Sequence, residues 1–159
     1  MRRTNPVITF LLFALAALWA TAPAQAKPNF SGEWKLNVSK SEFGPLPAPI
    51  SRTDKIKHED PALKITTTQA NQQGEGTFEL NYTTDGKESV NEIRGNTMKS
   101  TSKWDGDTLV IDTKANFGGN DLTLSDKWSL SGDGKVLTIN RHIASPMGEV
   151  DQKVVLEKK

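Results

Sequence analysis

The chain has 159 residues, with 20 basic and 19 acidic side chains and 35% apolar content, which suits one globular domain. A formal net charge of +1 argues against general electrostatic attraction to nucleic acid or to an anionic membrane surface. The absence of cysteine excludes a disulfide framework, a thiolate nucleophile and a zinc–thiolate site.

The first 26 residues predict a secretory signal peptide. Arg2 and Arg3 form a basic start, residues 7–20 are apolar but short for a membrane span, and Ala24-Gln25-Ala26 fits a cleavage site. Cleavage after Ala26 removes only two basic groups, so the mature chain stays nearly neutral. We therefore expect one exported domain at 27–159, periplasmic or extracellular and without stable membrane insertion; an uncleaved anchor is the alternative.

The segment NFSGEWKL, residues 29–36, predicts the first strand of the domain. Phe30, Gly32, Trp34 and Leu36 recur at period two, which places them on one face of a half-buried strand. Gly32 removes a side chain beside Trp34, so the strand can bend there or another backbone can approach closely. We expect a structural role for both residues.

Residues 39–51 predict a long loop, because three prolines between positions 45 and 49 oppose a helix or a central strand. Phe43, Leu46 and Ile50 give this loop apolar anchors. It could therefore cover an open barrel end as a lid or pack on the outside.

Turn signals then follow at short intervals and predict about ten strands with no convincing helix. This pattern favours an all-β fold, a single antiparallel up-and-down barrel of about 8–10 strands, with a blade or a sandwich as the competing architecture. Small polar residues on the expected inner faces mark either the wetter side of a cavity or an opening in the wall: Ser89, Asn91, Ser100 and Ser102. The expected turns are Asp60-Pro61, residues 73–76, Asp85-Gly86, Asp105-Gly106 and Asp133-Gly134.

The Gly32-x-Trp34 motif resembles the opening of lipocalins and fatty-acid-binding proteins, the calycin superfamily. This resemblance implies a barrel that holds a small ligand, with Trp34 buried near one end and the first strand beside the last, at about 149–157. Residues 39–51 lack the helix-turn-helix of fatty-acid-binding proteins. In lipocalins a basic side chain packs across the tryptophan, and the sequence assigns no residue to that role.

Most of the mature chain also resembles uncharacterised secreted proteins of acidobacterial type. The shared motifs are F-S-G-x-W-K-L at 30–36, W-D-G-D-T-L at 104–109 and W-S-L-x-x-D-G-K-x-L at 128–137. This second resemblance implies the same fold and export, and it implies no activity.

Two charged residues fall on apolar strand faces. Asp126 alternates with leucines and Trp128, while Arg141 alternates with Leu137, Ile139 and Ile143. A two-residue Asp133-Gly134 turn sets Asp126 opposite Arg141, and a four-residue turn makes them diagonal neighbours. Neither charge tolerates burial alone, so the pattern predicts an inward ion pair.

The Asp126 and Arg141 pair has two interpretations. The pair could have a structural role and stabilise the barrel wall. Alternatively, Arg141 could donate hydrogen bonds to an anionic ligand group while Asp126 orients Arg141, with Tyr82 or His58 nearby. The candidate ligand-binding residues are Arg141, Asp126, His58, Tyr82 and Trp128. His58 shares a face with Ile56, which favours a wall residue over a haem ligand.

No catalytic or metal-binding motif stands out. Two histidines, His58 and His142, are too few for a three-histidine zinc site, and neither a nucleophile elbow nor a phosphate-binding loop occurs. We therefore expect no enzyme, no cofactor and no metal, but a monomeric binder of a hydrophobic or amphipathic small molecule. The alternatives are a protein-protein interaction module, such as a barrel-shaped inhibitor of secreted enzymes, and an enzyme using Asp126, Arg141 or His58.

Overall fold

The computed structural model describes residues 26–159, so the predicted signal peptide lies almost wholly outside the described residues and stays a prediction. The described chain forms ten strands and one short 3-10 turn, η1 (Val38–Lys40). No helix among residues 26–159 has the length and apolar character needed to cross a membrane. The strands are β1 (Gly32–Leu36), β2 (Ser51–Glu59), β3 (Ala62–Asn71), β4 (Gly74–Thr83), β5 (Glu88–Ile93), β6 (Asn96–Asp105), β7 (Thr108–Phe117), β8 (Asn120–Leu130), β9 (Val136–Ser145) and β10 (Gly148–Lys158).

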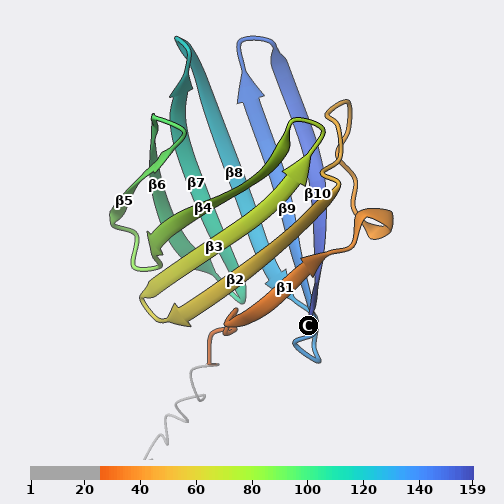
Figure 1. Ribbon diagram of the computed structural model, residues 1–159. Coiled ribbons are helices and arrows are strands. Elements are labelled where there is room, and N and C mark those ends of the chain that lie inside the picture. Colours follow the sequence, from red (N-terminus) through yellow and green to blue (C-terminus); the bar gives the residue numbers. More distant parts are fainter. Residues whose placement is uncertain (1–25) are drawn as a thin grey trace, which may run out of the picture.

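All ten strands belong to one antiparallel sheet that curls into a nearly closed barrel (Figure 1). Its order is β4-β3-β2-β1-β10-β9-β8-β7-β6-β5, so β1 lies beside β10 and the other neighbours follow chain order. The first strand therefore pairs with the last, as predicted, and the predicted up-and-down barrel is confirmed in place of a sandwich or blade. Curling brings the two edge strands, β4 and β5, side by side, so neither edge is left open as in a flat sheet.

The β6–β7 and β8–β9 hairpins turn where the sequence predicts. Gly106 adopts a φ of 58° between β6 and β7, a left-handed conformation that glycine accepts without strain. Between β8 and β9, Leu130 pairs with Leu137 and Asp126 with Arg141, the first of the two predicted registers. Earlier in the chain, Gly74 already belongs to β4, so the predicted turn at 73–76 is shorter than expected.

The expected two-residue hairpin at Asp85-Gly86 is wrong. β4 and β5 lie side by side without a backbone ladder, and they occupy the two ends of the sheet order. The linker between β4 and β5 forms hydrogen bonds with other parts of the chain. The Thr84 amide donates to the Pro61 carbonyl at 2.8 Å, and the Gly86 amide donates to the Ser102 carbonyl at 2.9 Å. These bonds hold the linker, and β5 runs back beside β4 with hydrogen bonds from the Ser89 and Asn91 side chains in place of a backbone ladder.

One end of the barrel, called the floor here, is packed solid. Trp34 is fully buried, and its indole Nε1 donates to the Phe30 carbonyl at 2.9 Å, which confirms its predicted place at a barrel end. Lys158 lies across the same ring, with Nζ 5.3 Å from the centroid, and supplies the basic side chain of the lipocalin pattern. A Cβ on Gly32 would meet the Lys158 Cε at 2.7 Å, so this glycine makes room for a side chain rather than a backbone.

The proline-rich segment packs along β10 and reaches the opposite barrel end. Glu42 and Lys153 exchange two backbone hydrogen bonds, and Phe43 packs against the core. Ile50 remains 66% exposed, so it does not anchor a lid. Pro45 and Leu46 lie at the rim of the open end.

Candidate functional site

Burial changes along the barrel axis. The inward side chains near the floor are fully buried, because they pack with Phe30, Trp34 and Trp128 in one core. At the opposite end, called the mouth here, inward apolar residues are only partly buried: Phe78, Leu122, Leu124, Ile143 and Val150. The interior is therefore filled at the floor and incompletely filled toward the mouth.

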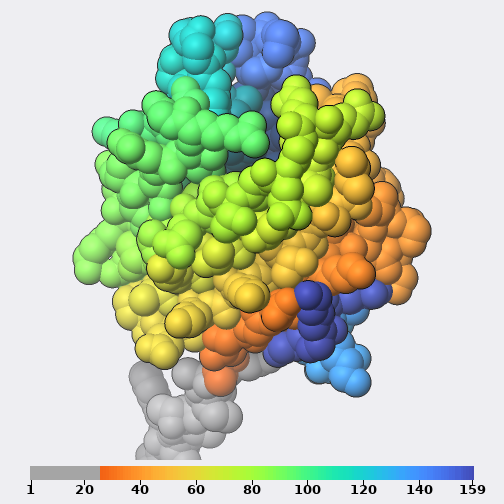
Figure 2. All heavy atoms as spheres, viewed as in Figure 1, coloured from red at the N-terminus to blue at the C-terminus, as the bar shows by residue number. Residues whose placement is uncertain are grey.

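A pocket of about 610 Å³ occupies the mouth. It lies where the β7–β8 and β9–β10 turns rise above the rest of the barrel, and Figure 2 shows the top of the molecule hollowed beside the cyan β7–β8 turn. Its lining is predominantly apolar: Pro45, Leu46, Phe117, Leu122, Ile143, Met147 and Val150, with Asn120, Asp121, Ser145, Gly148 and Glu149 at the rim. A pocket of this size and lining suits a small apolar molecule.

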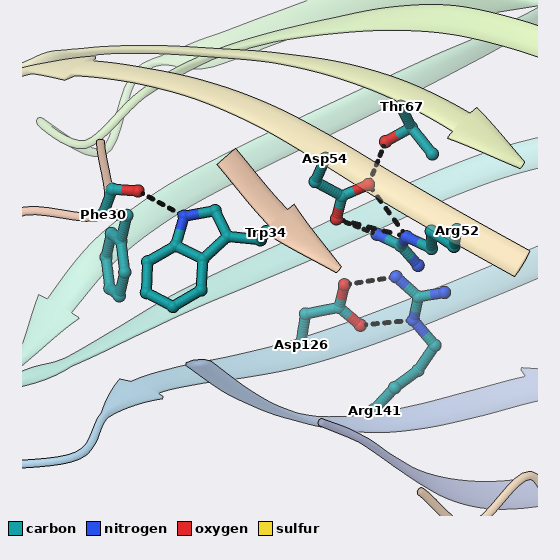
Figure 3. Close-up of polar contacts among 7 residues, drawn as sticks. All are labelled: Phe30, Trp34, Arg52, Asp54, Thr67, Asp126 and Arg141. Carbon is teal, nitrogen blue, oxygen red and sulfur yellow. Dashed lines mark hydrogen bonds and ion pairs between the residues drawn. The ribbon is translucent and has the colours of Figure 1, made fainter. Parts of the chain in front are cut away.

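The predicted Asp126 and Arg141 pair lies inside the barrel. Arg141 donates through Nε to Asp126 Oδ1 at 2.7 Å and through Nη2 to Oδ2 at 2.6 Å, a bidentate contact (Figure 3). Burial alone would lower the pKa of the Arg141 guanidinium, but the adjacent Asp126 carboxylate reverses this and raises its pKa above the ordinary value. The guanidinium therefore stays charged.

A second buried pair faces the first, from β2. Asp54 is fully buried and accepts from Arg52 Nε at 2.9 Å and Arg52 Nη2 at 2.8 Å, while the Thr67 hydroxyl donates to it at 2.8 Å (Figure 3). Sequence reasoning missed this pair. The sequence signal is weak, because Arg52 and Asp54 share a strand face with Ile56 and His58 and only one of these four residues is aliphatic. Arg52, Asp54, Asp126 and Arg141 together are called the charge layer below.

The charge layer contains two of the five predicted ligand-binding residues, Asp126 and Arg141. Tyr82 packs against the core, in the row of Leu63 and His58, and burial and then the Asp126 charge raise the pKa of its phenol. Trp128 instead belongs to the floor, where it meets Phe30 edge to face at 5.6 Å.

His58 also belongs to the floor rather than to the charge layer. Its ring stacks on Phe30 and Trp104, with centroids 5.5 and 6.0 Å apart, and Nδ1 accepts the Phe30 amide at 3.3 Å. Burial lowers the pKa of His58 below its ordinary value, and the nearby Asp60 carboxylate offsets only part of this effect. The structure therefore places His58 as a packed residue of the barrel wall, as the sequence predicts.

Hydroxyl groups line the inner wall on the β6–β7 side. Ser100 and Thr113 share a hydrogen bond of 2.7 Å, and both are buried. Ser102 is fully buried, and its Oγ has no hydrogen-bond partner among residues 26–159. The inner wall here is polar but uncharged.

Ser89 and Asn91 mark the opening in the wall instead. The Asn91 carboxamide accepts the Asn81 amide at 2.7 Å and donates to the Asn81 carbonyl at 2.9 Å. Ser89 Oγ accepts the Thr83 amide at 3.1 Å. The opening in the wall is therefore at Ser89 and Asn91, while Ser100 and Ser102 are buried in the interior.

Within the described part of the chain, no three histidine, aspartate or glutamate side chains come together as a metal site. A further hollow, of about 420 Å³, lies among side chains on the outer side of β6–β8, including Lys99, Asp112 and Lys114. Those charges are solvated, so the mouth offers the better surface for a small apolar molecule.

The fold matches solved structures of small β-barrels. A secretory abundant heat soluble protein from Ramazzottius varieornatus is 16% identical, with a TM-score of 0.60 over 84% of this chain and 97% of that one. Zebrafish ileal bile acid-binding protein in complex with cholic acid is 18% identical, with a TM-score of 0.55 over 82% and 98%. Human cRBP IV is 15% identical, with a TM-score of 0.54 over 82% and 98%.

These likenesses establish the fold: the chain forms a small antiparallel β-barrel like those of the matched structures, as the Gly32-x-Trp34 motif predicted. No protein-family model matches the sequence. No curated protein matches it either, so the resemblance to secreted acidobacterial-type proteins stays a prediction.

Proposed function

We propose that the mature chain is an exported binding protein that holds a hydrophobic or amphipathic small molecule in its barrel. The observation that carries this proposal is the pocket of about 610 Å³ at the mouth, whose lining is mainly apolar. Pockets of about 300 to 1,000 Å³ are the usual size for small-molecule sites. The similar zebrafish structure holds cholic acid, which agrees with this use of the fold.

The ligand would place its apolar part in the mouth and its polar part against the charge layer. Leu124 and Ile143 lie between the two, because each is two residues from a member of the Asp126–Arg141 pair on the same strand. Tyr82 would complete the polar wall. Trp128 and His58 would act indirectly by fixing the floor.

Export to the periplasm or the extracellular space forms part of the same proposal. It rests on the basic, apolar and small-residue pattern of residues 1–26. A protein isolated from its host should have a mass that corresponds to residues 27–159. Recovery of the full-length chain from the membrane fraction would instead support the alternative that residues 1–26 are an uncleaved membrane anchor.

Native mass spectrometry of protein purified from its host tests the ligand directly. We expect a noncovalent small molecule to accompany the chain and to dissociate on activation. A chain that is always ligand-free, but captures another protein through its loops, would favour the interaction-module alternative.

A variant pair tests whether the mouth is the site. Leu122 faces the pocket, whereas the next residue, Thr123, faces outward on the same strand. The substitution Leu122→Glu should weaken binding of the neutral dye Nile red by about tenfold or more, since it puts a charge in an apolar pocket. The matched control, Thr123→Glu, should bind the dye like the unaltered protein. Equal binding by both variants would place the dye elsewhere.

A further inference from the structure

The charge layer is electrically neutral, and this property bears on which polar group a ligand can carry. Arg52 and Arg141 contribute two positive charges, and Asp54 and Asp126 contribute two negative ones. Each arginine forms a bidentate pair with its own aspartate, so no positive charge is left unbalanced. An anionic ligand group placed here would meet two carboxylates as well as two guanidiniums.

We infer that the polar group recognised in this barrel is uncharged and carries a hydroxyl, so that the ligand is a neutral amphipathic alcohol rather than a carboxylate. This inference rests on the proposed function. It concerns the class of ligand, and it departs from the anionic group expected from Arg141 alone.

The first support is the hydrogen-bonding capacity that the pairs leave over. The contacts with Asp54 and Asp126 use Nε and Nη2 of each arginine, and neither Nη1 has a hydrogen-bond partner among residues 26–159. Each carboxylate oxygen can also accept further hydrogen bonds. A hydroxyl both donates and accepts, so one hydroxyl can bridge a carboxylate oxygen and a guanidinium N–H. A carboxylate can only accept.

The second support is the cost of an extra buried charge. A carboxylate loses its hydration free energy when it leaves water, and only a cation without a partner of its own can offset that loss. The charge layer supplies no such cation. Taking Asp126 or Asp54 from its arginine would leave that aspartate buried without compensation. A neutral hydroxyl incurs neither cost.

The third support comes from the β6–β7 part of the inner wall. Ser102 lies in the same row across the sheet as Asp126, since both pair with Ile111. Its Oγ is fully buried and unpartnered within the described chain, beside the Ser100 and Thr113 hydroxyls. This wall offers neutral groups that both donate and accept, and it adds no cation.

The charge layer is within reach of the mouth. The side chains of Arg141 and Arg52 are 26% and 14% exposed, so water reaches part of both arginines. Ile143 lines the mouth pocket and stands two residues from Arg141, a separation of about 7 Å along a strand. A molecule seated in the mouth would therefore reach the charge layer with a short polar end.

Competition between two ligands of equal chain length tests the inference. Bound Nile red would be displaced by 1-dodecanol or by dodecanoate at about pH 8, where the acid is fully ionised. We expect the alcohol to compete at a concentration at least about tenfold lower, and dodecanoate to compete better as the pH falls toward the pKa of the acid.

Equal or stronger competition by dodecanoate at the higher pH would overturn the neutral-ligand inference and leave the proposed function intact. Failure of both molecules, or of the dye itself, to bind would overturn the proposed function.

Unbalancing the charge layer provides a second test. The substitution Asp126→Asn leaves Arg141 uncompensated and should shift the preference toward dodecanoate by at least about tenfold. The matched control is Asp112→Asn, since Asp112 lies on the outer face of β7 and bonds only the Ser125 hydroxyl among the described residues. Its preference should remain that of the unaltered protein. An unchanged preference in a folded Asp126→Asn variant would contradict the inference; if that variant does not fold, the pH dependence of dodecanoate competition in the unaltered protein still decides it.

Discussion

His58 shows how one floor residue ties stability to pH. Because its Nδ1 accepts the Phe30 amide, the neutral ring carries its proton on Nε2, and full protonation would cost this hydrogen bond. Burial lowers the pKa of His58 in the folded chain. Its contribution to stability is thus present above the unfolded pKa of about 6.5 and is lost as the pH falls through the lower folded pKa.

We therefore expect urea unfolding to show decreasing stability as the pH is lowered from about 7.5 to about 5. The variant His58→Gln should show a flatter dependence, because its side chain can still accept the Phe30 amide but does not titrate. His142→Gln, on the outer face, is the control. A slope that survives in His58→Gln and disappears in His142→Gln would assign the effect to the other histidine.

At the scale of strands, the β8–β9 hairpin depends on its inward ion pair. Removal of Arg141 leaves the Asp126 carboxylate buried without a partner, which typically costs about 3 to 5 kcal/mol. We expect Arg141→Ala to lower the free energy of unfolding by the lower part of that range, since the arginine is partly exposed. The double change Asp126→Leu with Arg141→Met should recover most of the loss. Denaturant unfolding at constant pH measures both.

The surface pair Lys64–Glu79 is the matched control, because it also joins neighbouring strands but is about half exposed. Its lysine should be replaceable by alanine at a cost below about 1 kcal/mol. Equal losses at the two sites would mean that the interior pair is screened by water and does not hold the hairpin.

The two ion pairs also show when strand alternation is enough to predict an inward charged residue. Asp126 and Arg141 could be predicted because their strand faces are otherwise apolar, which makes a charge conspicuous and fixes the register. On the β2 face, Arg52 and Asp54 outnumber the single aliphatic residue, Ile56, so the alternation carries little hydrophobic contrast. Their inward position follows only from the pairing of β2 with β1 and β3.

For the whole molecule, the barrel could be predicted from alternation and turn spacing and the β1–β10 pairing from the resemblance, but neither the β1–β10 register nor the break between β4 and β5 could. The Lys158 contact with Trp34 depends on the β1–β10 register, which joins residues more than a hundred positions apart. The break between β4 and β5 depends on the linker bonds of Thr84 and Gly86 to distant carbonyls. Neither leaves a local signature in the sequence.

The break between β4 and β5 gives the last prediction. The Asn91 carboxamide takes the place of a peptide group there, since it bonds both the amide and the carbonyl of Asn81. Asn91→Ala should therefore lower the free energy of unfolding by about 1 to 2 kcal/mol, because two partly buried backbone groups lose their partner. Hydrogen exchange of the Asn81 amide should accelerate well beyond that global change, while the ladder amides between β9 and β10 should follow the global change alone.

Ser89→Ala should produce the same local effect at the Thr83 amide, which loses its acceptor, and leave the Asn81 amide protected. Asn140→Ala, an exposed change on β9, should alter neither amide. If the Asn81 amide in Asn91→Ala exchanges no faster than the β9–β10 ladder, then the wall is held closed at this line by the packing of its neighbours, and the side-chain bridge contributes nothing to closure.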